Sequence, residues 1–93
     1  MTKLIQPDNE FTYDGTTIRA YKANVGEGLP KHQHEYAHAT ICFYGSLIIR
    51  KEGIEKILRL GDAPINLREN EWHEIEALED GTMFANVFAE GKY

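Results

Sequence analysis

The four histidines of the chain, His32, His34, His38 and His73, are the residues whose type and spacing point most directly to chemistry. Three of them fall within one stretch of seven residues. In a β-strand, side chains two positions apart face the same side, so a strand through His32 and His34 would present both imidazoles to one ion. The cluster predicts a site for one divalent transition metal, and imidazole ligands suit iron, manganese, nickel, copper, cobalt and zinc alike.

The other two histidines extend this predicted site. His38 follows His34 after a three-residue connection and opens an apolar segment, so a hairpin would bring its ring beside the first pair. His73 shares one face of the alternating segment 72–77 with Ile75. We expect His38 to bind the metal or to contact its ligands, and His73 to bind the metal or to be a hydrogen-bonded core histidine.

Short strands separated by turns would position these histidines. Runs of β-branched and aromatic residues alternate with turns that contain glycine, and no segment offers a capped helix of three turns. The pattern predicts an all-β antiparallel sandwich or barrel with no helix longer than about two turns. The predicted strands cover residues 17–24, 38–44, 46–50, 54–60, 65–67, 72–77 and 82–89.

The stretch from Gly26 to Gly45 resembles the first motif of the cupins, written as G, five residues, HxH, three or four residues, E, six residues, G. Every spacing matches, and His38 stands where the motif has its glutamate. The second cupin motif is G, five residues, PxG, two residues, H, three residues, N. Here His73 stands at the ligand position. The sequence departs from the motif in that Gly61 comes one residue too early, and Arg68, Asn70 and Ala77 stand in place of the motif's Pro, second Gly and Asn. Asn tolerates the left-handed backbone that the motif's second glycine supplies.

The resemblance implies a double-stranded β-helix, also called a cupin or jelly-roll barrel, as a single domain over residues 1–93 with its motif-bearing core at about 19–89. It implies one metal near a mouth of the barrel, bound by His32, His34, His38 and His73. The function expected is a metal-dependent enzyme for a small organic substrate, of the dioxygenase type or a non-redox lyase or isomerase. A non-catalytic small-molecule-binding module and a structural metal-binding barrel are the alternatives.

Five further residues are candidates for roles at such a site. Tyr36 and Cys42 are candidate catalytic groups, although Cys42 suits the core and Tyr36 the core or a dimer interface. Arg19 is a candidate for binding a substrate carboxylate, with a surface ion pair as its alternative. Trp72 and Asn86 are candidate substrate contacts, against a packing role and a solvent-facing position respectively.

Composition restricts the partners. The net charge of -5 argues against non-specific nucleic-acid binding. Residues 1–10 contain no apolar run, so they predict neither a signal peptide nor a membrane span, and the single cysteine excludes an intrachain disulfide. We therefore expect a cytoplasmic protein whose partner is a small molecule. A core this small also favours a homodimer that covers some of Tyr21, Tyr44 and Phe88.

Overall fold

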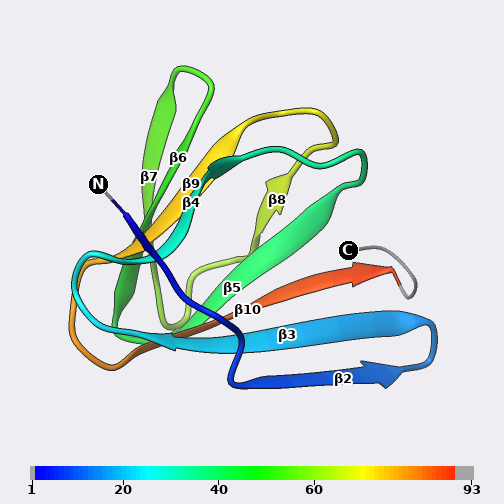
Figure 1. Ribbon diagram of the computed structural model, residues 1–93, viewed down its shortest axis with the longest axis horizontal. Helices are drawn as coiled ribbons and strands as arrows, with labels where there is room; N and C mark the ends of the chain where they lie inside the picture. The colour runs from blue at the N-terminus through cyan, green and yellow to red at the C-terminus, as the bar shows by residue number, and fades with distance from the viewer. Residues whose placement is uncertain (1, 90–93) are drawn as a thin grey trace.

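Two five-stranded sheets face each other in the computed structural model, which describes residues 2–89 (Figure 1). Sheet A has the strand order β1-β4-β9-β6-β7, and sheet B has the order β2-β3-β10-β5-β8. Apart from the parallel pair β1 and β4, every pairing in this part of the chain is antiparallel. The strands are β1 (Lys3–Leu4), β2 (Asn9–Tyr13), β3 (Thr16–Ala23), β4 (Glu27–His32), β5 (His38–Tyr44), β6 (Ser46–Lys51), β7 (Ile54–Arg59), β8 (Ile65–Leu67), β9 (His73–Ala77) and β10 (Thr82–Ala89).

The all-β expectation is confirmed, and residues 2–89 contain no helix. They accordingly include no helical segment with the length and apolar character needed to cross a membrane. The strands expected at 38–44, 65–67 and 82–89 coincide with β5, β8 and β10. Those expected at 46–50, 54–60 and 72–77 differ from β6, β7 and β9 by one residue at one end, and the strand expected at 17–24 is shifted by one residue from β3 at both ends. Three strands were not predicted, namely β1, β2 and β4.

The sequence contains a turn motif between β2 and β3 that the strand prediction did not take into account. Asp14 and Gly15 join the two strands, and both have positive φ angles, 50° and 78°. Two such residues in a row form the type I′ turn that the Asp-Gly pair favours. All five residues of β2 are exposed, so the strand lacks the apolar alternation that marks a half-buried strand.

Strand β4 was missed because its sequence, EGLPKH, contains two residues that are depleted in strands. Gly28 is required there by the close approach of β9. A Cβ atom on Gly28 would lie 2.0 Å from the carbonyl oxygen of Ile75, so no side chain fits at this position. The residue that weakens the strand signal is therefore the one that lets β4 pack on β9.

Alternate residues of both sheets fill the interior. Tyr21 of β3 and Phe84 of β10 stack with ring centroids 4.8 Å apart and lie at the centre of sheet B's inner face. The buried apolar cluster includes Tyr21, Ala23, Leu29, Cys42, Leu47, Ile49, Leu58, Ile65, Leu67, Ile75, Ala77 and Phe84. This cluster draws on every strand from β3 to β10, so it fixes the two sheets relative to each other.

The outer face of sheet B is apolar as well. On the central strands β3, β10 and β5, Lys22 is the only charged residue at the positions that alternate with the buried ones. The apolar outward positions of the sheet are Phe11, Tyr13, Ile18, Ala20, Ala39, Ile41, Phe43, Met83, Ala85 and Val87. Of the three aromatic residues expected not all to be interior, Tyr21 and Phe88 are buried within the chain and Tyr44 is 59% exposed.

We expect two copies of the chain to associate through this face of sheet B. The strands of sheet B have 5, 8, 8, 7 and 3 residues, so with strands about 4.8 Å apart the face measures roughly 500 Å² in projection. A pair of these faces buries about 1,000 Å², roughly the smallest area expected of a biological interface. Ile41→Lys should convert the dimer to a monomer in sedimentation velocity. Ile57→Lys, on the outer side of sheet A, is the matched control and should leave the dimer intact. A wild-type monomer at micromolar concentration would contradict the prediction.

Candidate metal centre

The fold brings all four histidine rings together at one end of the barrel. His32 is the last residue of β4 and His73 the first of β9, and they are register partners with ring centroids 4.3 Å apart. The ring of His34 lies 4.6 Å from that of His32. His38 opens β5, and its ring lies 5.0 Å from His73 and 5.4 Å from His34.

The prediction that one β-strand runs through both His32 and His34 is wrong, although their rings do lie together. Strand β4 ends at His32, so His34 lies in the connection to β5 and strand alternation does not orient it. That connection is fixed by Asn70, whose backbone N–H donates to the carbonyl oxygen of His34 at 2.6 Å. Asn70 has a φ of 59°, so it does adopt the left-handed conformation that a glycine would otherwise supply.

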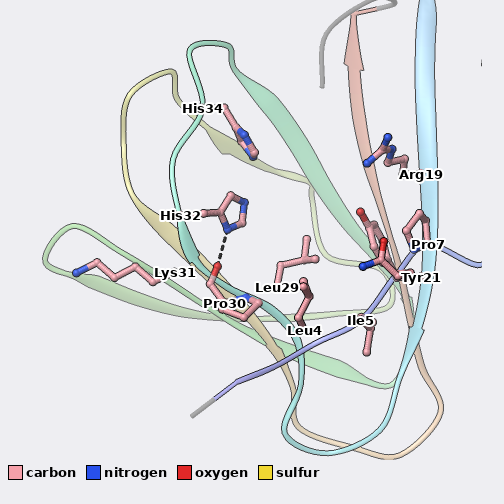
Figure 2. A pocket seen from close by; sticks show the side chains of 11 residues that line it. Leu4, Ile5, Pro7, Arg19, Tyr21, Leu29, Pro30, Lys31, His32 and His34 are labelled. Carbon is pink, nitrogen blue, oxygen red and sulfur yellow. Dashed lines mark hydrogen bonds between the residues drawn. The ribbon is translucent and has the colours of Figure 1, made fainter.

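Two of the rings are oriented by backbone carbonyls two residues earlier. His32 Nδ1 lies 2.5 Å from the oxygen of Pro30, and His73 Nδ1 lies 3.1 Å from the oxygen of Glu71 (Figure 2 shows the first bond). Because a carbonyl can only accept, each Nδ1 carries the proton. The lone pair of each neutral ring is then on Nε2, which is the arrangement that metal-binding histidines use.

Ligand atoms of His32, His34 and His73 lie within 4.8 Å of one another. Two nitrogens on one ion, each at about 2.1 Å, are at most about 4.2 Å apart, so these three side chains need little movement to share an ion. His38 lies outside this group of three but contacts it through its ring. The structure therefore brings three of the predicted ligands close to binding geometry and places the fourth beside them.

The site contains buried nitrogen atoms without hydrogen bonds. Within residues 2–89, no partner reaches Nε2 of His73 or either ring nitrogen of His38. Burial, followed by repulsion from the neighbouring histidines, lowers the pKa of His38 to about 3 and that of His73 to about 4, and burial also lowers the pKa of His34. Neutral, buried lone pairs that converge on one volume fit a divalent metal, which would satisfy them.

A cavity of about 360 Å³ borders the site on the side of His32 and His34 (Figure 2). Its opposite wall comes from β3, through Arg19 and Tyr21. A third wall was not predicted, because the segment 4–7 carries no pattern that marks it as functional. That segment and the residue after it bridge the two sheets. The backbone N–H of Ile5 donates to the carbonyl oxygen of Gly28 on β4 at 3.0 Å, and the backbone N–H of Asp8 donates to the carbonyl oxygen of Ala20 on β3 at 2.9 Å.

The other candidate residues have different surroundings. Tyr36 stacks on His34, with centroids 4.8 Å apart. Trp72 does not line the cavity and lies under the ammonium group of Lys31, 4.4 Å from it. Asn86 is fully buried and so not solvent-facing. It accepts a hydrogen bond of 2.7 Å from the Thr40 hydroxyl.

Cys42 lies in the core, away from the histidines. It is four residues along β5 from His38, which is roughly 13 Å of strand. Its thiol donates to the carbonyl oxygen of Tyr44 at 3.4 Å, and burial raises its pKa. Cys42 is therefore a protonated packing residue, and Tyr36 is the candidate catalytic group that remains beside the site.

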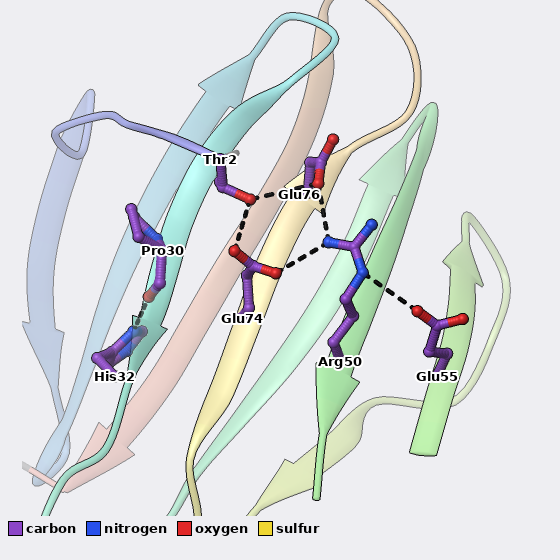
Figure 3. A network of polar contacts seen from close by, with 7 residues as sticks. All are labelled: Thr2, Pro30, His32, Arg50, Glu55, Glu74 and Glu76. Carbon is purple, nitrogen blue, oxygen red and sulfur yellow. Dashed lines mark hydrogen bonds and ion pairs between the residues drawn. The ribbon is translucent and has the colours of Figure 1, made fainter. Parts of the chain in front are cut away.

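Carboxylates next to the site face away from it. Glu74 and Glu76 alternate with His73 along β9 and lie on the outer side of sheet A (Figure 3). Arg50 donates to them at 3.0 and 2.8 Å, and the Thr2 hydroxyl donates to Glu74 at 2.9 Å. The hydrogen bond from Arg50 lowers the pKa of Glu76. This half-exposed network keeps β9's negative charge on the solvent side, so the donors in the interior are neutral imidazoles.

Two sheets around a common interior, with histidines gathered at one mouth, define the cupin fold, and solved structures agree. KdgF from a Halomonas species superposes with a TM-score of 0.79 at 20% identity, over 87% of this chain and 74% of KdgF. A cupin-2 domain protein from Shewanella frigidimarina gives a TM-score of 0.74 at 13% identity, over 92% and 84%. A double-stranded β-helix protein from Klebsiella pneumoniae gives 0.73 at 19%, over 92% and 78%. No family model and no curated protein matches the sequence.

Proposed function

We propose that the chain is a metal-dependent enzyme for a small organic molecule, with one divalent transition ion bound by His32, His34, His38 and His73. The observation that supports this proposal is the cluster of buried, neutral imidazoles beside a cavity of about 360 Å³. A metal that served only stability would be enclosed by four protein ligands without a cavity beside it.

A bound ion would act as a Lewis acid toward a substrate oxygen, because four neutral donors leave its double positive charge uncompensated. The chain orients the donors through the Nδ1 bonds of His32 and His73. The ring of Tyr36 covers one side of His34, and its centroid lies 6.5 Å from that of His38. Tyr36 is the group placed to move a proton, at its phenol oxygen, near a bound substrate.

Two reaction types suit this arrangement, namely dioxygen-dependent cleavage and a non-redox lyase or isomerase reaction. A non-catalytic binding module is the second candidate function. It is favoured by the shortage of acid–base groups, since the lining of the cavity contains no carboxylate. Consumption of dioxygen during turnover distinguishes the two reaction types, and chemical change of the ligand distinguishes an enzyme from a binding module.

The test begins with elemental analysis of untagged protein purified without added metal. The protein is then loaded separately with iron, manganese and zinc, and diketones, catechols and small carboxylates are screened for loss of compound and of dioxygen. We expect at least one metal form to change at least one compound, and the chelated protein and His73→Ala to change none. If compounds bind the metal form reversibly and none is altered, the binding module replaces the enzyme.

A further inference from the structure

A second cavity, called here the edge cavity, opens between the two sheets. Strand β7 is the outermost strand of sheet A and β8 the outermost strand of sheet B, and a cavity of about 330 Å³ lies between them. Among residues 2–89 it shares no lining residue with the cavity beside His32 and His34. Its lining residues are Ile49, Lys51, Ile54, Lys56, Pro64, Ile65 and Asn66.

The inner end of the edge cavity is apolar and is set by packing. Ile49 and Ile65 are 1% and 8% exposed, and both belong to the buried cluster that joins the sheets. The connection from β7 to β8 is fixed by a turn, in which the backbone N–H of Arg59 donates to the carboxylate of Asp62 at 2.8 Å and the N–H of Asp62 donates to the carbonyl oxygen of Arg59 at 3.0 Å. Preformed apolar walls and a volume of this size are typical of small-molecule sites.

Lys56 gives the edge cavity a positive charge. It is two positions from the buried Leu58 along β7 and is the register partner of the buried Ile49, so its side chain leaves the strand on the inner side of sheet A. Within residues 2–89, no carboxylate lies within ion-pair distance of its ammonium group, whereas Arg19 in the other cavity is paired with Glu10. A cation beside apolar side chains and without a carboxylate attracts an anionic ligand.

The charged residues around Lys56 have partners of their own. Glu55 points to the outer side of sheet A, where Arg50 donates to it at 3.2 Å (Figure 3). Lys51 forms an ion pair of 3.5 Å with Glu71 and also donates to a carbonyl oxygen of β8 at 3.4 Å. No acidic residue of the described chain lines the edge cavity, although the sequence has 15. Lys51 therefore forms a wall of the cavity, and Lys56 is the cation available to a ligand.

We propose that the edge cavity binds a small organic carboxylate. Its carboxylate pairs with the ammonium group of Lys56, and its hydrocarbon part packs on Ile49 and Ile65. A lysine ammonium group is a compact point charge that suits one anionic group, and the apolar inner end favours an anion with a hydrocarbon body over a bare inorganic one. One available cation balances one negative charge, so a monoanion fits better than a phosphate dianion. The inference does not rest on the proposed function, because the histidines do not line this cavity.

Benzoate and its neutral analogue benzamide test the proposal. They are titrated into protein kept metal-free with a chelator, and the isoleucine methyl groups are observed by NMR. The methyl signals of Ile49, Ile54 and Ile65 report on the edge cavity, and the signal of Ile5 reports on the other one. Benzoate should shift the first three signals and bind about 5-fold more tightly than benzamide, the upper value for one ion pair near the surface.

Two variants separate the charge from the shape of the site. Lys56→Gln should remove the preference for benzoate and leave the affinity for benzamide unchanged, because Lys56 is exposed and the substitution removes little besides its charge. Lys3→Gln is the matched control, since Lys3 is an exposed lysine of β1 that lines neither cavity. It should leave both affinities unchanged.

Several results would overturn the inference. They are equal affinity for benzoate and benzamide, a preference that persists in Lys56→Gln, and benzoate shifts at Ile5 in place of the three signals from the edge cavity. The absence of any shift at about 10 millimolar benzoate, roughly tenfold above a weak dissociation constant of about 1 millimolar, would also overturn it. Tighter binding of inorganic phosphate than of benzoate would contradict the assignment of an organic carboxylate.

Discussion

Replacing His34 by alanine is expected to abolish stoichiometric metal binding. His34 is one of the three histidines whose ligand atoms already lie within 4.8 Å of one another, and the lining of the cavity beside it contains no carboxylate and no imidazole besides His32 and His34. Loss of groups that merely orient ligands weakens metal affinity by about 10- to 100-fold, so loss of a ligand itself should exceed about 100-fold. Metal content of the purified variant, by elemental analysis, is the measurement.

Two companion variants make this result specific. Gln33→Ala changes an exposed neighbour of the same connection and should retain one equivalent of metal. His38→Ala tests the fourth ligand: metal should also be lost, and retention with an affinity reduced only about 10-fold would restrict the ligand set to His32, His34 and His73. Stoichiometric metal in His34→Ala would refute the assignment of the site.

Mild acid is expected to destabilise the metal-free protein steeply. An unfolded histidine titrates near its ordinary pKa of 6.5, whereas folding lowers the pKa of His38 to about 3 and that of His73 to about 4. Below pH 6.5 the unfolded state therefore binds more protons than the folded state, and the free energy of unfolding falls as the pH is lowered. For these two buried groups together the slope is at most about 2.7 kcal/mol per pH unit, and it flattens below pH 4 and then pH 3.

Urea unfolding with a chelator present, at pH values from 7.5 to 4.5, measures this slope. His38→Leu removes one of these titrating groups and should reduce the slope by up to about 1.4 kcal/mol per pH unit. A bound metal competes with protons for the same nitrogens, so the metal-loaded protein should resist acid to a lower pH. A free energy of unfolding that stays constant from pH 7.5 to 4.5 would show that these histidines are not buried as neutral groups.

Sequence patterns predicted the strands in which strand-forming residues coincide with a buried face. Strands β5 and β10 combine strand-forming residues with one fully buried face, so apolar content and alternation indicated both. Strand β4 failed for the opposite reason, because Gly28 and Pro30 weaken a strand that close packing on β9 requires. Tertiary contact overrides local preference at this point.

The candidate site was predictable in its residues and less so in its geometry. Three of the chain's four histidines fall within seven residues, so clustering alone marked His32, His34 and His38. Their orientation depends on the backbone carbonyls at Pro30 and Glu71 and on Asn70, which no spacing rule specifies. The position of Arg19 across the cavity follows from the pairing order of sheet B, so it required the fold.

The hydrogen bonds at Nδ1 of His32 and His73 would bear on when the proposed ion enters the protein. They orient both rings through the chain's own carbonyls, and the apolar cluster between the sheets includes none of the four histidines. We therefore expect folding to precede uptake of the proposed ion, unlike in zinc fingers, where the ion drives folding. A folded barrel with ready donors would be able to exchange its ion, and imidazoles accept most first-row metals. We therefore expect the metal supply around the folded protein, more than the supply during synthesis, to decide which ion is bound.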